Sequence, residues 1–163
     1  MMNNPVAEAR YEETGTWVFW DIDECPVPRG WKSQEIAQKI ISALNKLNYC
    51  GPLSISAYGN MNHIPSSIKQ ALSSTGIVLN HVTPTGSGLG RLYMFDKMLE
   101  WKREIPPPAN LMLISRDGGL CYLLRNQKEY NNTLLAHPPH SSDYMLASAK
   151  TKWLWKSILE EPL

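Results

Sequence analysis

The stretch TWVFWDIDECPVPRG, residues 16–30, places three acids and a cysteine directly after a short run of strand-forming residues. Residues 17–20 are too few for a helix and predict a first strand that is buried on both faces. The prolines and the glycine in the second half of the stretch then force a loop. The three acids, Asp21, Asp23 and Glu24, therefore follow the carboxyl end of a buried strand.

Strands and helices alternate along the rest of the chain. Apolar spacing predicts helices over residues 33–48, 65–73, 89–103, 119–128 and 141–159, and short apolar runs predict strands over residues 53–58, 77–82, 111–115 and 133–136. In the 89–103 helix the expected buried stripe includes Leu92, Phe95 and Leu99. This order predicts the α/β class, with a central, mainly parallel five-stranded sheet covered by helices on both faces.

Composition limits the classes of protein to consider. The chain has 163 residues, 43% of them hydrophobic, so we expect a single folded domain. Its formal charge is only +1, so we do not expect it to bind nucleic acid through its overall charge. Three cysteines without a CxxC pair argue against a disulfide framework and a zinc ribbon. With no apolar signal core and no membrane-length apolar run, we expect an intracellular, cytoplasmic domain without membrane association.

A fourth acid, Asp117, follows the predicted fourth strand. In parallel sheets ligands bind beyond the carboxyl ends of the strands, near the point where the strand order reverses. If strands one and four are neighbours, Asp117 meets the acids of the opening stretch there. Clustered carboxylates are stabilised by Mg²⁺ or Mn²⁺, which can activate water against a phosphodiester. From spacing alone, a metal site and an acidic helix-capping loop without chemistry both remain open.

Five segments together resemble the NYN domains, which are PIN-like ribonuclease domains: VFWDIDECPVP, SISAYGN, LSSTGIVLNHV, PPPANLMLISRD and AKTKWLW. The resemblance covers residues 16–159, and within the family the chain is most similar to plant relatives of the meiosis-arrest (limkain-type) factors. It predicts a domain over residues 16–160 that follows an N-terminal extension of residues 1–15. It implies a PIN-like three-layer α/β/α sandwich and divalent-metal-dependent cleavage of single-stranded RNA. It also implies a module of a larger plant RNA-regulatory protein, or a small stand-alone relative, working beside RNA-decay or regulatory proteins.

The resemblance implies catalytic roles for the acids that match the family pattern. Asp21 and Asp117 would be both catalytic residues and metal ligands, Asp23 stands where the family has a longer acid, and Glu24 replaces an asparagine as an extra acid. Asn60 follows the second strand, where plant members tend to carry an acid.

Three other departures weaken the expected Mg²⁺ or Mn²⁺ site. The family places acids at the head of the third helix and two residues beyond the aspartate that follows strand four, whereas this chain has Gly88, Arg91 and Gly119. A cation inside a metal cleft lowers Mg²⁺ affinity by about 1–4 kcal/mol, depending on solvent exposure. The sequence thus favours an RNA-binding domain with weak or lost catalysis, and leaves open an active endoribonuclease and a non-catalytic protein-interaction scaffold.

Basic and aromatic residues near the predicted strand ends are the candidate RNA contacts. Arg29, Arg91 and Arg116 lie in loops or at a helix start on that edge, where they would bind phosphates. Trp31, in the loop after the acidic turn, would stack on a base. An ordinary solvated surface is the alternative for the basic residues.

Overall fold

A six-stranded parallel sheet forms the middle of the protein in the computed structural model, which describes residues 4–83 and 89–163, without the side chains of residues 89–91. The strands within the described residues are β1 (Thr16–Asp21), β2 (Leu53–Gly59), β3 (Val78–His81), β4 (Asn110–Ile114), β5 (Asn132–His137) and β6 (Thr151–Leu154). They lie in the order β3-β2-β1-β4-β5-β6, and every neighbouring pair is parallel.

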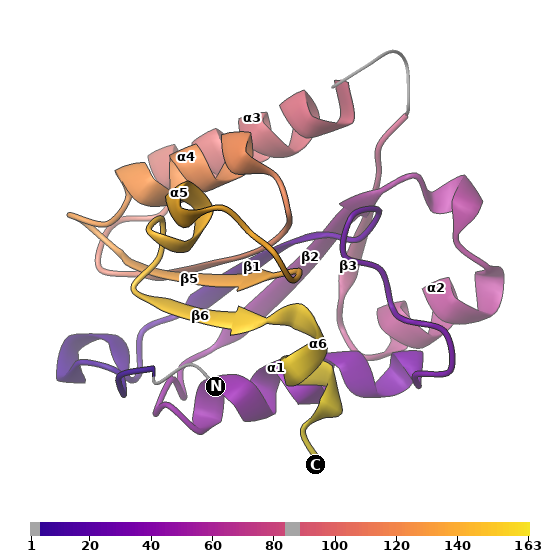
Figure 1. Cartoon of the computed structure of the whole chain (residues 1–163), viewed down its shortest axis with the longest axis horizontal. Coiled ribbons are helices and arrows are strands. Elements are labelled where there is room, and N and C mark those ends of the chain that lie inside the picture. The colour runs from indigo at the N-terminus through magenta and orange to yellow at the C-terminus, as the bar shows by residue number, and fades with distance from the viewer. Residues whose placement is uncertain (1–3, 84–88) are drawn as a thin grey trace.

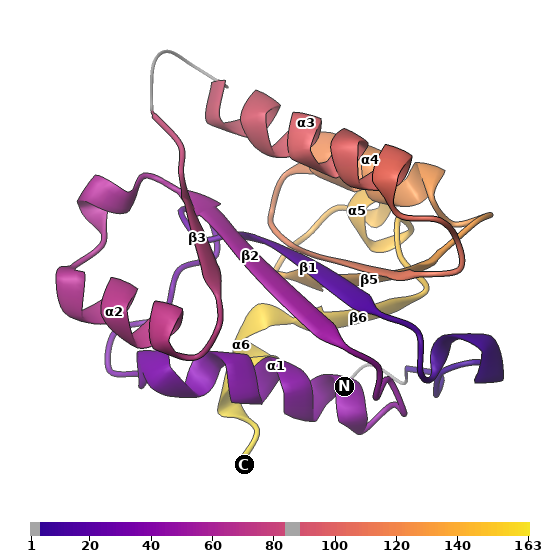
Figure 2. The same cartoon turned by 180° about the vertical axis from the view of Figure 1, so that it is seen from behind.

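Helices cover both faces of the sheet and make a three-layer α/β/α sandwich (Figures 1 and 2). One face carries α1 (Ile36–Asn45), α2 (Ser66–Ser74) and α6 (Trp155–Glu160), and the other carries α3 (Leu89–Glu104), α4 (Gly118–Asn126) and α5 (Asp143–Leu146). Short 3₁₀ turns occur at Ala9–Tyr11, Ser33–Glu35 and Met61–His63. The expected α/β sandwich is confirmed.

The sheet has one strand more than the five expected, because the helix predicted over residues 141–159 is wrong. Thr151–Leu154 is instead the edge strand β6, paired in parallel with β5, and only short helices stand before and after it. A β-branched threonine and the partly buried ring of Trp153 suit a half-buried strand. These four residues follow one lysine and contain another, and their alternation of polar and apolar side chains was too short to be recognised.

Alternating side chains of β1 enter two separate cores. Val18 and Trp20 pack under α1 and α6, and Phe19 packs under α3 and α4. The indole Nε1 of the fully buried Trp20 donates to the carbonyl of Cys25 at 2.7 Å, which fixes the loop after the strand. Among the described side chains of α3, Met94, Met98 and Trp101 are buried. Of the stripe expected there, Phe95 and Leu99 are half-buried against the same core, whereas Leu92 is 57% exposed and was wrongly included.

Residues of the predicted N-terminal extension also pack against the domain. Ala7 and Tyr11 are buried in the core below α1, and the Asn110 amide donates to the Tyr11 carbonyl at 3.1 Å. The Asn4 side chain bonds the backbone of Lys152 on β6, accepting from its nitrogen at 3.1 Å and donating to its oxygen at 2.9 Å. Within the described residues, no helix is long and apolar enough to span a membrane.

The order of the strands reverses between β1 and β4. From β1 the chain builds outward through β2 and β3, and from β4 it builds in the opposite direction through β5 and β6. In sheets of this type the crevice at that point, beyond the carboxyl ends of the strands, is the usual ligand site. The end of β1 and the end of β4 therefore define the edge at which function is expected.

Candidate functional site

Polar side chains stand in adjacent positions across this edge of the sheet. Tyr58 on β2 is paired in register with Asp21 on β1. Trp20 is paired with Ile114, so the next residues along the two strands, Asp21 and Ser115, lie side by side. Ile114 is paired with Ala136, so Ser115 and His137 lie side by side in the same way. Because side chains alternate along a strand, these four belong to the face covered by α3 and α4. The two acidic strand ends therefore meet, as the sequence predicted for neighbouring strands.

Ser115 links the two acids. Its hydroxyl donates to Oδ2 of Asp21 at 3.0 Å and accepts from the backbone nitrogen of Asp117 at 3.0 Å. Ser115 is fully buried, so the pair of bonds is held in place by the surrounding core. No role was predicted for this serine from the sequence, although it stands directly between β4 and the Arg116–Asp117 pair.

Asp21 is the acid whose ionisation is most perturbed. Burial raises its pKa from 3.8 to about 6, the negative charges of Glu24 and Asp23 add to the rise, and the hydrogen bond from Ser115 opposes it. At neutral pH this carboxylate is ionised at a cost in free energy, which is the condition in which a cation or another positive group is attracted.

Asp117 is bound into the start of α4. Its Oδ1 accepts from the backbone nitrogens of Gly119 and Leu120 at 2.7 and 3.1 Å, so it is the N-cap of this helix. A Cβ at position 119 would lie 3.0 Å from Oδ1 of Asp117. The glycine at this position thus leaves room for a tight cap.

Asp23 is held by the end of β2. Its Oδ2 accepts from the backbone nitrogen of Asn60 at 2.9 Å, and a Cβ at Gly59 would come within 2.6 Å of its Oδ1. The buried Asn60 side chain accepts from the backbone of Asn62 and contacts the His63 ring at 3.2 Å. Asn60 therefore organises the loop around Asp23.

Glu24 and Arg116 form an ion pair over the strand ends, with Nε and Oε2 separated by 3.4 Å. The side chains are 50% and 64% exposed, so the pair contributes at most about 1 kcal/mol to stability. Arg116 can therefore exchange Glu24 for a phosphate at little cost, and a guanidinium suits that geometry.

The other predicted RNA contacts differ in what surrounds them. Arg29 is exposed in the loop after β1, and Trp31 is half-buried against the core below α1, with Nζ of Lys39 5.9 Å from its ring centre. Arg91 lies in the first turn of α3, but its side chain is outside the described part of the structure, and Gly88 lies outside the described residues altogether.

The described residues do not form a preassembled set of three protein ligands for the Mg²⁺ or Mn²⁺ ion that the family resemblance implies. Among the side chains that the structure describes, no group of three or more His, Cys, Asp or Glu residues is placed to hold a metal ion. Asp23 and Asp117 accept hydrogen bonds from backbone N–H groups, and Asp21 accepts one from Ser115. All three carboxylates thus accept hydrogen bonds from the protein itself.

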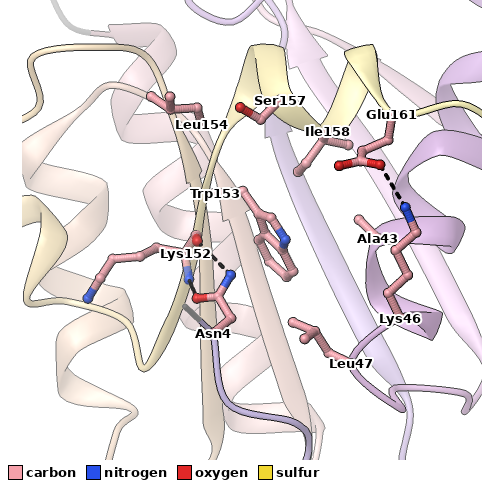
Figure 3. Close-up of a pocket in the computed structure, with 10 residues that line it drawn as sticks. All are labelled: Asn4, Ala43, Lys46, Leu47, Lys152, Trp153, Leu154, Ser157, Ile158 and Glu161. Carbon is pink, nitrogen blue, oxygen red and sulfur yellow. Dashed lines mark hydrogen bonds and ion pairs between the residues drawn. The ribbon is translucent and has the colours of Figure 1, made fainter. Parts of the chain in front are cut away.

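A cavity of about 720 Å³ lies away from these acids, between α1, α6 and β6 (Figure 3). Its wall includes the Trp153 ring, and the Lys46–Glu161 ion pair, 2.8 Å long, stands at its side. None of the residues predicted to bind RNA lines it.

Comparison with known proteins identifies the family. The model of the NYN domain matches residues 15–154. A crystal structure of a protein of unknown function from Vibrio parahaemolyticus is similar at a TM-score of 0.62 and 12% identity, covering 90% of this chain and 94% of the other, which shows a shared fold. No curated protein matched the sequence. Because the family model spans most of the chain, the protein belongs to the NYN domain family, whose PIN-like nuclease fold carries RNA-related functions.

Proposed function

We propose that the domain binds single-stranded RNA at the carboxyl ends of β1 and β4 and cleaves it weakly or not at all. The observation that carries the proposal is the position of Arg116. Its exposed guanidinium stands at the reversal point of the sheet, 3.4 Å from Glu24 and next to the Asp117 cap. A nuclease centre needs cations supplied by metal ions there, whereas this chain supplies one of its own.

The expected contacts divide into phosphate and base contacts. Arg116 and Arg29 are exposed and would bind phosphates, and Arg91 would join them from the start of α3. Trp31 would offer the exposed part of its ring to a base, with the buried part held by the core. RNA bound in this way is positioned by its backbone and is read weakly for sequence.

The structural roles of the acids support weak catalysis. Asp117 caps α4 and Asp23 fixes the loop after β2, so both have structural tasks that need no metal. The remaining acid, Asp21, is half-shielded by the sheet and bonded to Ser115. Gly119 stands where the family resemblance implies an acid, and Asn60 stands where plant members tend to carry one.

An active endoribonuclease is the second candidate function. It is favoured by Asp21 and Asp117, which flank Ser115 at the reversal point, where a hydrolase acting on phosphodiesters would hold Mg²⁺ or Mn²⁺. A protein-interaction scaffold that binds no RNA would be the outcome if neither retention nor cleavage of RNA is found.

Fluorescence anisotropy with a labelled 12-nucleotide RNA, in EDTA, tests the proposal. Arg116→Ala should weaken binding about fivefold to tenfold, as loss of a charge-assisted phosphate contact predicts. Lys156→Ala is the matched control, because this exposed lysine pairs with Glu160 on α6, over the opposite face of the sheet. Equal losses in both variants, or no loss in Arg116→Ala, would reject the site.

The motifs also support a finer proposal, that the domain works in a cytoplasmic plant protein related to the meiosis-arrest (limkain-type) factors, beside RNA-decay or regulatory proteins. Purification of the tagged protein from plant cytosol, with and without ribonuclease, tests this. Recovery of RNA-decay proteins that survives the ribonuclease supports direct partners, and recovery of none contradicts them.

A further inference from the structure

Aromatic and basic residues form a row on the exposed side of α4. The row consists of Tyr122, Arg125 and Lys128, which are spaced three residues apart. Tyr122 is 52% exposed, Arg125 is exposed, and Lys128 lies just past the end of the helix. Residues three apart are neighbours on a helix, and six residues span about 9 Å along its axis. Because α4 is capped by Asp117, this row begins one turn from the strand-end site and leads away from it.

α5 and the chain after it add to this row. The Arg125 guanidinium lies 5.4 Å from the ring centre of Tyr144, which is 43% exposed. Nζ of Lys128 donates to the carbonyl of Ala147 at 2.8 Å, and Nζ of Lys152 donates to that of Leu146 at 2.9 Å. Two cations are thus gathered at the carboxyl end of α5.

The positive charges of this region repel one another. Burial lowers the pKa of Lys128, and the nearby charges of Arg125, Lys152 and Lys150 lower it further. In a chain of net charge +1 this is a local concentration of cations. Capping of α5 explains where Lys128 and Lys152 point, but it does not require exposed tyrosines on both sides of Arg125.

We propose that these six residues bind the part of a single-stranded RNA that extends beyond the strand-end site, and we call them the α4 surface: Tyr122, Arg125, Lys128, Tyr144, Lys150 and Lys152. The cations contact phosphates, and the tyrosine rings stack on bases. The inference rests on the proposed function, because the RNA enters this surface from the strand ends.

The chemistry of the α4 surface favours single-stranded RNA over other anionic partners. Alternation of cations with exposed rings matches a polyanion that offers a flat base with each phosphate, and stacking on a ring is worth about 1–3 kcal/mol per base. An acidic peptide would pair with the cations and leave the tyrosine faces unused. The continuity of α4 with the strand-end site gives one strand a path across both.

Oligonucleotide length separates the α4 surface from the strand-end site. Binding of labelled 4- and 12-nucleotide RNAs to the full chain is measured by anisotropy, for the native protein, Arg125→Ala/Lys150→Ala, Tyr122→Ala and Arg116→Ala. The native protein should bind the 12-mer at least tenfold more tightly than the 4-mer. The double variant should lose about tenfold for the 12-mer and less than twofold for the 4-mer, and Tyr122→Ala about fivefold for the 12-mer alone.

Arg116→Ala should weaken both lengths, which distinguishes the two proposals. If neither RNA binds the native protein, the proposed function fails. If both bind but the α4 variants match the native protein on the 12-mer, the α4 surface fails alone. The salt dependence of 12-mer binding should also fall by about 0.7 in log–log slope for each cation removed. Displacement of the 12-mer by polyglutamate as readily as by unlabelled RNA would assign the surface to acidic polypeptides and overturn the inference.

Discussion

Replacing Asp21 by asparagine should stabilise the protein at pH 8. Burial is the main reason that the pKa of Asp21 is raised from 3.8 to about 6. A carboxyl group with a raised pKa binds its proton more tightly in the folded state than in the unfolded state. Folding therefore has to ionise a shielded group at high pH, and an amide of the same shape removes that cost.

The size and the pH range of the gain follow from the two pKa values. A pKa difference of about two corresponds to roughly 3 kcal/mol, with 1.36 kcal/mol for each pKa unit. The penalty is absent well below pH 3.8, grows as the pH rises, and is complete above pH 6. It should be about 1 kcal/mol at pH 4.5. The gain in stability from Asp21→Asn should not exceed this value, because the amide accepts the Ser115 hydrogen bond less strongly than the carboxylate does.

Urea unfolding followed by tryptophan fluorescence measures this difference at pH 8 and pH 4.5. The control is Asp96→Asn, because Asp96 is an exposed carboxyl group on α3 and its replacement should change the free energy of unfolding by less than about 0.5 kcal/mol. An Asp21→Asn protein no more stable than the native one at pH 8 would refute the reasoning, as would the same gain at both pH values.

Three further changes probe the surroundings of the site. Asp117→Ala removes the cap of α4 and should lower the free energy of unfolding by about 1 kcal/mol, more than Asp117→Asn does, as measured by urea unfolding; equal losses would contradict the capping role. Gly59→Ala should destabilise the fold by about 1–3 kcal/mol in the same assay, because its Cβ would overlap the Asp23 carboxylate, and an unchanged midpoint would contradict that contact. Of the three free cysteines only Cys50 is exposed, and burial raises the pKa of Cys25 to about 12. Mass spectrometry after brief thiol labelling should therefore find one modified residue, Cys50. Rapid labelling of a second cysteine would contradict the burial of Cys25 and Cys121.

Much of the fold could be predicted from the sequence because its central strands are buried on both faces. Strands β4 and β5 appear as continuous apolar runs, and the structure places them within a residue or two of the predicted bounds. Strand β6 could not be found in this way. It is a strand because it pairs with β5 and closes the edge of the sheet, a non-local interaction that leaves little trace in four residues.

The position of the site was predictable and its internal bonding was not. The sequence predicted that the acidic ends of β1 and β4 meet if the two strands are neighbours, and the parallel pairing of these strands meets that condition. The Ser115 link and the pairing of Arg116 with Glu24 depend on the direction of individual side chains, which residue spacing does not encode. The departure at Gly119 was visible in the sequence, but its physical meaning, a tight cap by Asp117, needed the backbone geometry.

The most direct test of the central claim is to follow binding and cleavage of one labelled single-stranded RNA by the native protein while Mn²⁺ is added. The proposed function predicts that the RNA stays bound to the protein and remains mostly full-length on a denaturing gel at every Mn²⁺ concentration, with slow cleavage at most. Robust Mn²⁺-dependent shortening of most of the RNA by the native protein, lost in Asp21→Asn, would contradict the claim and establish an active endoribonuclease.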